Sequence, residues 1–177
     1  MHEPNDKVSI TIRQAQEGDL QACRLIEDDA GEIFAAIGMT EIDDDPPRGL
    51  DDLRAAQRRG DVWIACDRND VPVAFALTAT VDGNLHLDEM GVLRSWQRQG
   101  IGRRLIDHLI ATATARGLPA ITLTTFRAVP WNAPYYEHLG FTAIAETVYG
   151  PEMAALVAEE ERHGLDRQTR VVMRRSL

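Results

Sequence analysis

Cysteine is scarce in this sequence, and its placement excludes several kinds of chemistry. The 177-residue chain has two cysteines, Cys23 and Cys66, and neither stands in a metal-binding or redox-active spacing. Both fall among apolar residues, so we expect buried thiols and no covalent acyl-cysteine route. The five histidines also lack metal-ligand spacing, so no metal site is predicted.

Long hydrophobic runs are absent as well. No apolar segment approaches the length that spans a bilayer. Residues 1–7 are polar, and no apolar segment of the kind found in secretory signals follows them. These patterns favour a cytoplasmic protein with no membrane partner.

Basic charge is in deficit, with 19 Lys and Arg residues against 28 Asp and Glu residues and a formal net charge of −9. Because phosphate binding needs a basic face, nucleic acid is not expected as a partner. The acidic balance fits a cationic small molecule, or simply solubility. With 44% hydrophobic residues and no repeat or linker, residues 1–177 are predicted to form one domain, with residues 1–7 frayed.

Hydrophobic periodicity predicts alternating strands and helices. Strands are expected at residues 8–13, 61–66, 71–81, 85–93, 120–125, 141–148 and 169–174. Helices are expected at residues 50–59, 101–116, 133–139 and 151–163, and a first helix is capped by Asp19 and interrupted at Gly31. Asp82-Gly83-Asn84 indicates a hairpin. The acidic stretch Glu41–Asp45 is expected to be a solvated turn, with an acidic rim that attracts an amine as the alternative.

The stretch from Leu85 to Arg116 carries the strongest functional pattern. A predicted strand leads into a turn with Gly100 and Gly102, and a helix begins at once. Free N–H groups and partial positive charge at a helix start attract an anion, and glycine lets the backbone approach it. Arginines in the first turn are easier to explain beside an anion. The alternative is a tight turn followed by solvated arginines.

Two motifs in this order resemble those of the GNAT superfamily of acyl-CoA N-acyltransferases. The first reads Gln97-Arg98-Gln99-Gly100-Ile101-Gly102 after the strand Leu87–Val92, and the second reads Tyr135-Tyr136-Glu137-His138-Leu139-Gly140-Phe141. The order of predicted elements is also similar from about Val8 to Ile144. The resemblance implies an α/β fold with a central mixed sheet of about six to seven strands, flanked by helices and splayed between its two central parallel strands.

The resemblance further implies acetyl-CoA as the cofactor. It places the pyrophosphate on backbone amides of the glycine turn and the pantetheine arm on the end of the preceding strand. The implied cofactor-binding residues are Met90, Gly91, Val92, Gln97, Arg98, Gln99, Gly100, Ile101, Gly102, Arg103, Arg104 and Asn132. The Val92 N–H would polarise the thioester carbonyl. Val129 stands where many members of the family carry the pantetheine-binding Asn. Gly91 predicts either a bulge or close approach, or a simple strand irregularity.

Acyl transfer to an amine also needs a base and an acid. Glu89 is the first candidate base and Asp88 the second; they point to opposite faces of a strand, so only one can serve. Tyr136 is the candidate acid for the coenzyme A thiolate, with a core aromatic as the alternative.

The acceptor site is predicted from residues near these two motifs. Tyr135, Phe126 and Trp131 would shape it. Glu27 and Glu32 are candidate amine-binding groups, although solvated helix positions also explain them. The predicted function is acetyl-CoA-dependent, direct N-acetylation of the primary amine of a small molecule. A protein or peptide acceptor and a non-catalytic acyl-CoA sensor are the alternatives. Because the family often dimerises, a homodimer is compatible with the resemblance.

Overall fold

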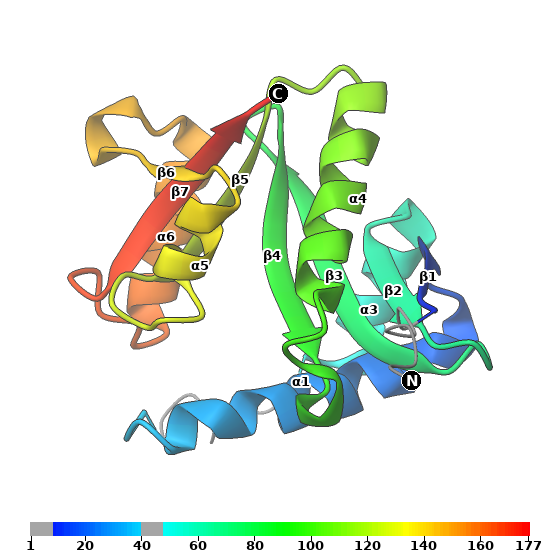
Figure 1. Ribbon diagram of the computed structural model, residues 1–177. Coiled ribbons are helices and arrows are strands. Elements are labelled where there is room, and N and C mark those ends of the chain that lie inside the picture. Colours follow the sequence, from blue (N-terminus) through cyan, green and yellow to red (C-terminus); the bar gives the residue numbers. More distant parts are fainter. Residues whose placement is uncertain (1–8, 40–47) are drawn as a thin grey trace, which may run out of the picture. The chain divides into compact units, whose positions relative to one another are not determined.

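The computed structural model describes residues 9–39 and 48–177 and contains a seven-stranded mixed sheet (Figure 1). The predictions for residues 1–7 and for Glu41–Asp45 lie outside the described residues. The strands are β1 (Thr11–Gln14), β2 (Val62–Cys66), β3 (Pro72–Val81), β4 (Asn84–Val92), β5 (Ala120–Phe126), β6 (Thr142–Ala143) and β7 (Arg170–Ser176). They pair in the order β1-β2-β3-β4-β5-β7-β6, and β4 and β5 run parallel. The predicted α/β mixed sheet is confirmed.

Five helices flank the strands of the described chain. They are α1 (Leu20–Ala35), α3 (Leu50–Arg59), α4 (Ile101–Ala115), α5 (Ala133–His138) and α6 (Pro151–Arg162). Short 3-10 turns are η1 (Glu17–Asp19), η2 (Arg94–Trp96) and η3 (Glu146–Val148). None of the helices among the described residues is long and apolar enough to cross a membrane.

The chain forms two compact units, and β3 and β4 each contribute to both. The first unit contains the chain up to Leu77 together with Glu89–His108, and the second contains Thr78–Asp88 and Leu109–Leu177. The expectation of a single domain stays a prediction.

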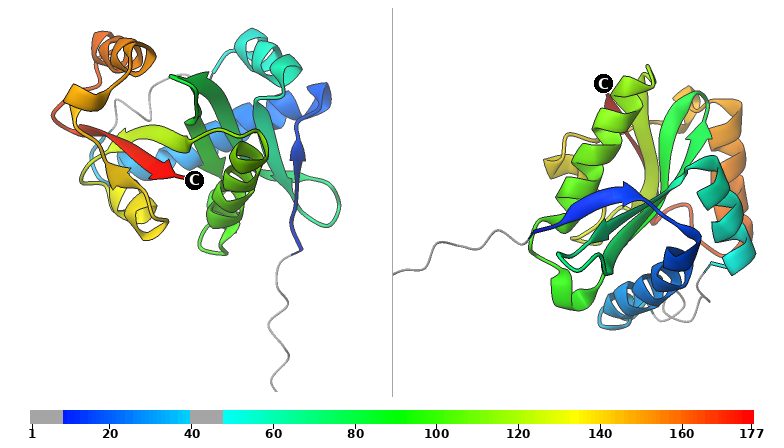
Figure 2. Two further views of the ribbon diagram at one scale, coloured as in Figure 1. Left: turned by 90° about the horizontal axis from the view of Figure 1, so that it is seen from above. Right: turned by 90° about the vertical axis from the view of Figure 1, so that its right-hand side faces the viewer.

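In the first unit, α1 and α3 cover one face of β2 and the start of α4 covers the other (Figures 1 and 2). The apolar stripe of α1 forms this core because its buried residues recur at helical spacing. The core of this unit contains Leu20, Cys23, Ile26, Leu53, Ile64, Cys66 and Phe75. Both cysteines are buried and free, as predicted, and burial raises the pKa of the Cys23 thiol to about 12 and that of Cys66 to about 11.

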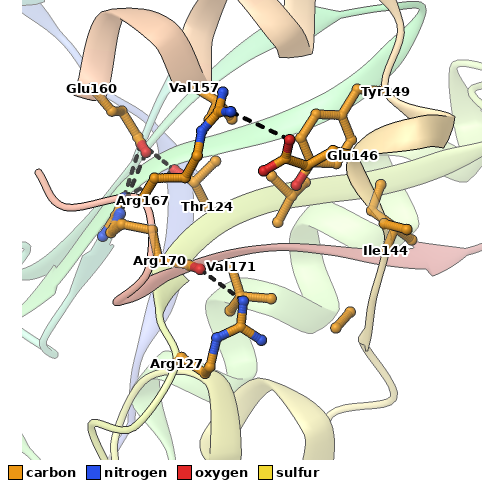
Figure 3. A pocket seen from close by; sticks show the side chains of 13 residues that line it. Thr124, Arg127, Ile144, Glu146, Tyr149, Val157, Glu160, Arg167, Arg170 and Val171 are labelled. Carbon is orange, nitrogen blue, oxygen red and sulfur yellow. Dashed lines mark hydrogen bonds and ion pairs between the residues drawn. The ribbon is translucent and has the colours of Figure 1, made fainter. Parts of the chain in front are cut away.

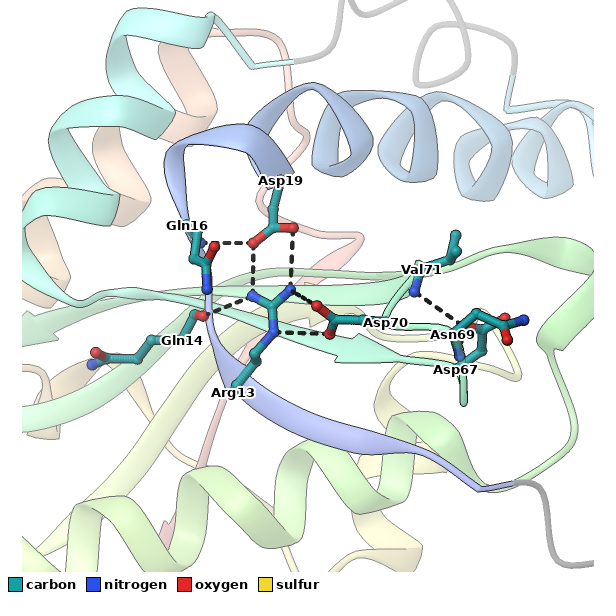
Figure 4. A network of polar contacts seen from close by, with 8 residues as sticks. All are labelled: Arg13, Gln14, Gln16, Asp19, Asp67, Asn69, Asp70 and Val71. Carbon is teal, nitrogen blue, oxygen red and sulfur yellow. Dashed lines mark hydrogen bonds and ion pairs between the residues drawn. The ribbon is translucent and has the colours of Figure 1, made fainter.

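Two predictions for the first helix are wrong. Helix α1 runs through Gly31 without a break, because one glycine costs only about 1 kcal/mol relative to alanine and the packed face outweighs it. Asp19 stands at the N-cap position, yet its side chain does not cap α1. Its carboxylate accepts a hydrogen bond from the Gln16 N–H at 2.7 Å and pairs with Arg13 at 2.8 Å, and Arg13 also pairs with Asp70 (Figure 4). The Asp19 carboxylate therefore caps the start of η1, through the Gln16 N–H, and does not cap α1.

In the second unit, α5 and α6 lie on opposite faces of β7 (Figures 1 and 2). The hairpin turn before β4 supports α6: the Asp82 carboxylate accepts hydrogen bonds from the backbone N–H groups of Glu152 at 3.0 Å and Met153 at 2.9 Å. These bonds satisfy amides at the start of the helix. Because a Cβ at position 150 would overlap that carboxylate, Gly150 is needed beside it.

The predicted hairpin is confirmed, with positive φ angles of 48° at Asp82 and 72° at Gly83.

The parallel ladder joins Leu85–Leu87 to Ile121–Leu123, while β4 continues to Val92. The predicted strand at residues 141–148 is mostly wrong, because β6 contains only Thr142 and Ala143. After one further bond, from the Ile144 N–H to the Val172 carbonyl at 3.0 Å, the chain turns into η3.

Candidate functional site

The turn between β4 and α4 has the backbone shape of an anion cradle. Arg98 and Gly100 have positive φ angles of 62° and 78°, and alternation of this kind turns successive N–H groups toward one side. The Gln97 side chain donates to the Val92 carbonyl at 3.1 Å and so ties the turn to the end of β4. Gln99 donates to the Ser95 carbonyl at 3.3 Å. The side chains of both glutamines thus fix the turn.

Helix α4 starts directly after this turn. Its first internal hydrogen bond runs from the Arg104 N–H to the Gly100 carbonyl at 3.1 Å, so the N–H groups of residues 101–103 have no acceptor within the helix. Together with the helix dipole they fit a phosphate-bearing group. The exposed Arg103 side chain pairs loosely with Asp107 at 3.6 Å, one turn later. The Arg104 guanidinium donates to the Ile10 carbonyl at 2.6 Å and thereby holds the chain entering β1.

Gly91, near the end of β4, makes a close approach to side chains of its own unit. A Cβ at this position would lie 2.9 Å from Cε1 of Phe75 and 3.2 Å from Cγ2 of Ile26. Both neighbours are fully buried. Packing therefore supplies a reason for glycine here, while Met90 and Val92 on either side are partly buried.

Two carboxylates of the first unit meet at one arginine. Nε of Arg48 lies 3.4 Å from Oε2 of Glu89, and the Arg48 N–H donates to Oε2 of Glu27 at 2.9 Å. The Glu89 side chain is 21% exposed, so it is accessible yet partly shielded. Sequence reasoning missed Arg48, because no periodic pattern marks this position and it precedes Glu89 by 41 positions.

The other predicted carboxylates lie in different surroundings. Asp88 is exposed and belongs to the second unit. Glu32 pairs with Arg94 at 2.6 Å, and Asp29 binds the same arginine at 3.2 Å. Glu32 therefore helps to anchor η2 on α1.

The predicted acid and acceptor-site aromatics lie in the second unit. The Tyr136 ring makes edge contacts with Tyr135 at 5.4 Å and Phe141 at 5.7 Å between ring centroids. Burial raises the pKa of the Tyr136 hydroxyl, with Tyr135 as a smaller cause, so the hydroxyl is a proton donor at neutral pH. Phe126 is buried, and its ring lies 4.6 Å from the Arg170 guanidinium carbon.

Trp131 and Asn132 precede these tyrosines and are partly buried. Asn132 stands at the N-cap of α5, where its carbonyl accepts from the Tyr136 N–H at 3.0 Å and its side chain makes no capping bond.

His86 is a buried histidine that joins two strands. Its Nδ1 lies 3.0 Å from Oγ1 of Thr122 on the neighbouring strand, and burial lowers its pKa. Among residues 9–39 and 48–177, no group of three or more His, Cys, Asp or Glu side chains is arranged to hold a metal ion.

Known proteins resemble the chain in sequence and in fold. The ribosomal protein bS18-alanine N-acetyltransferase of Escherichia coli strain K12 is 35% identical over 74 residues, which is 42% of this chain and 50% of that protein. The chain thus spans about half the length of the curated relatives it matches.

Solved structures align over almost the whole chain. The crystal structure of the ribosomal-protein-S18-alanine N-acetyltransferase from Escherichia coli has a TM-score of 0.63 at 22% identity and covers 95% of this chain and 94% of that chain. N-acetylglutamate synthase from Neisseria gonorrhoeae, in complex with coenzyme A and N-acetyl-glutamate, has a TM-score of 0.71 at 17% identity. That alignment covers 97% of this chain and 36% of the synthase.

The family comparison includes both the turn before α4 and the tyrosine segment. The profile of the Acetyltransferase (GNAT) family matches residues 26–141, which is more than half of the sequence. The two motifs, the parallel β4–β5 pair and the cradle at α4 all lie within this match. The protein therefore belongs to the Acetyltransferase (GNAT) family.

Proposed function

We propose that the protein catalyses direct transfer of an acetyl group from acetyl-CoA to the primary amine of a small molecule. The observation that carries the proposal is the cradle before α4, where Arg98 and Gly100 adopt positive φ at a helix N-terminus. The synthase from Neisseria gonorrhoeae, which shares the fold, was crystallised with coenzyme A. Acetyl-CoA would supply the activated thioester.

Residues of the turn and of β4 would hold the cofactor. The N–H groups of residues 101–103 are suited to the pyrophosphate, since the helix leaves them without internal acceptors. The exposed side chains of Arg98 and Arg103 add positive charge beside them. The end of β4 would bind the pantetheine arm through its backbone, with the Val92 N–H on the thioester carbonyl.

Glu89 would accept the proton of the acceptor amine. Its carboxylate is partly shielded and already binds a cation, the Arg48 guanidinium. Glu27 contacts the same arginine and would add to the negative field that attracts an ammonium group. Asp88 remains the second candidate base.

Tyr136 would return a proton to the leaving thiolate. Burial raises the pKa of its hydroxyl and keeps it protonated at neutral pH. Tyr135, Phe126 and Trp131 would shape the acceptor site.

A protein acceptor is the second candidate function, and the Escherichia coli relative favours it because that enzyme acts on an alanine of a ribosomal protein. The deciding experiment measures thiol release from acetyl-CoA with two panels, one of small amines and one of peptides with free N-termini. Turnover with small amines alone supports the proposal. Turnover with peptides alone would replace the small-molecule acceptor with a protein.

The same assay, run beside a measurement of acetyl-CoA binding, tests the alternative that the protein is a sensor without catalytic activity. Binding of acetyl-CoA with no turnover across both panels would favour a sensor. A partly shielded carboxylate and a tyrosine hydroxyl that stays protonated at neutral pH are groups that acyl transfer needs and that a sensor does not, which favours catalysis.

A further inference from the structure

A cavity of about 330 Å³ lies within the second unit, in a region to which the proposed transfer assigns no role (Figure 3). Its walls come from β5, β7 and α6 and from residues 143–149. The volume lies at the small end of the ~300–1,000 Å³ range of ligand pockets. Five charged side chains line it, namely Arg127, Arg167, Arg170, Glu146 and Glu160.

One wall of the cavity is a fixed polar network. Arg170, 14% exposed, donates to Glu160 at 2.8 Å and to the Thr124 hydroxyl at 3.0 Å, and the Thr124 hydroxyl also donates to Glu160. The guanidinium lies over the Phe126 ring. The charge of Arg170 is therefore matched by Glu160, and the packed network holds both side chains in place.

Arg127 differs from the other two arginines of the cavity. Its Nη2 donates to the Arg170 carbonyl at 3.0 Å, and within the described ranges no carboxylate forms an ion pair with it. Arg167, in contrast, pairs with Glu146 at 3.3 Å and with Glu161 at 3.8 Å. A guanidinium has several N–H donors in a planar fork, so Arg127 retains donors for a ligand.

The Tyr149 hydroxyl in the lining lies near charges of both signs. Burial raises its pKa, as do Glu146 and Glu160, while Arg167 and Arg127 lower it. The three arginines exceed the two glutamates of the lining, which leaves an excess of positive charge in a protein of net charge −9.

Apart from the charged groups and the hydroxyls of Thr124 and Tyr149, the lining is apolar. Val157 and Val172 belong to the buried core of this unit, and Ile144 packs against them. A ligand therefore meets a guanidinium at one part of the cavity and branched aliphatic side chains at another.

We propose that this cavity binds a small organic carboxylate with a short, branched apolar chain. The carboxylate would accept hydrogen bonds from the planar fork of Arg127, for which it is the matching anion. The apolar chain would contact Ile144, Val157 and Val172. None of the residues that line the cavity has an assigned part in acetyl-CoA binding or in acyl transfer.

The test uses isovalerate as the probe and the full chain without acetyl-CoA or amine. Binding is measured by ligand-observed NMR titration, with isovaleramide as the neutral analogue and inorganic phosphate as a competing anion. We expect isovalerate to bind at least about ten-fold more tightly than isovaleramide, because a hydrogen bond to a charged group is worth ~1.5–3 kcal/mol. Phosphate should compete weakly, since it lacks the apolar chain.

Three variants locate the site. Arg127→Gln should weaken isovalerate binding about ten-fold or more, and Arg127→Lys should weaken it less, because it keeps the charge and loses the fork. Arg58→Gln, which removes an exposed arginine of α3 in the other unit, is the matched control and should bind as the unchanged protein does.

The proposal would be overturned if isovalerate did not bind at tens of millimolar, or if isovaleramide bound equally well. It would also be overturned if Arg127→Gln bound isovalerate with full affinity, or if phosphate bound more tightly than isovalerate. Circular dichroism checks the fold of each variant. Should Arg127→Gln fail to fold, the comparison of acid and amide on the unchanged protein decides.

Discussion

The Arg48 guanidinium lies 3.4 Å from the Glu89 carboxylate, and the backbone of the same arginine donates to Glu27. Arg48 thus forms an ion pair with Glu89, the carboxylate that we propose accepts the proton of the amine. Arg48 and a protonated amine carry the same charge, so they compete for Glu89.

Replacement of this arginine should improve amine binding. We expect Arg48→Gln to lower the KM for the amine by up to about five-fold with little change in kcat, because a partly exposed ion pair contributes ~0.2–1 kcal/mol. Steady-state kinetics at saturating acetyl-CoA measure both constants. Arg58→Gln is the matched control and should leave them unchanged. A higher KM in Arg48→Gln would show that Arg48 helps to bind the acceptor.

Tyr136→Phe removes the proposed acid and keeps the ring contacts. Because general acid catalysis contributes ~10²–10⁴-fold, kcat should fall by about that factor, while the affinity for acetyl-CoA stays similar. Tyr135→Phe is the control, and its effect on kcat should be much smaller. Turnover equal to that of the unchanged protein would remove Tyr136 from the mechanism.

Gly91→Ala should destabilise the protein by about 1–3 kcal/mol, because the added Cβ would lie 2.9 Å from the buried Phe75 ring. Gly31→Ala is the control. Its added Cβ would have no described atom within 4 Å apart from the neighbouring residues and backbone of its own helix, and alanine in a helix should stabilise by about 1 kcal/mol. Urea unfolding gives both values. An unchanged free energy of unfolding in Gly91→Ala would contradict this prediction, because it would mean that the Phe75 ring shifts without cost.

The buried histidine His86 should make the protein less stable in mild acid. Burial lowers the pKa of His86 below its ordinary value of 6.5, so the unfolded chain binds more protons just below pH 6.5. The free energy of unfolding should therefore decrease as the pH falls below 6.5. Above pH 6.5 the contribution of the neutral histidine is fully present. In His86→Gln this dependence should be weaker, with part left from His108, whose pKa burial also lowers. The free energy of unfolding between pH 5 and 8 checks this, and an unchanged slope in His86→Gln would contradict it.

Local features of the fold were predictable from the sequence because each depends on nearby residues. The hairpin follows from Asp82-Gly83, and α4 follows from a four-residue apolar repeat that ends before Gly117. The predicted cap at Asp19 failed although its partners are near in sequence, because Arg13 and the Gln16 N–H bind the carboxylate that would otherwise cap α1.

The candidate site was predictable in the same limited way. The glycine turn before α4 has a local signature, whereas the positive φ of Arg98 does not. The contacts of Glu89 with Arg48, and of Gly91 with Phe75, join residues far apart in the chain, and no periodic pattern marks them. The shortness of β6 depends on pairing with β7, which the apolar run at residues 141–148 does not reveal.

Calorimetric titration with acetyl-CoA tests the central claim, that the turn before α4 binds this cofactor. We predict micromolar binding to the unchanged protein and an affinity about ten-fold lower in Gly100→Ala, since a side chain at φ +78° costs ~1–2 kcal/mol and shifts the cradle. Gly117→Ala imposes similar strain at φ +69°, beyond the other end of α4, and should bind normally. No heat at millimolar acetyl-CoA, or equal affinity in Gly100→Ala, would contradict the account.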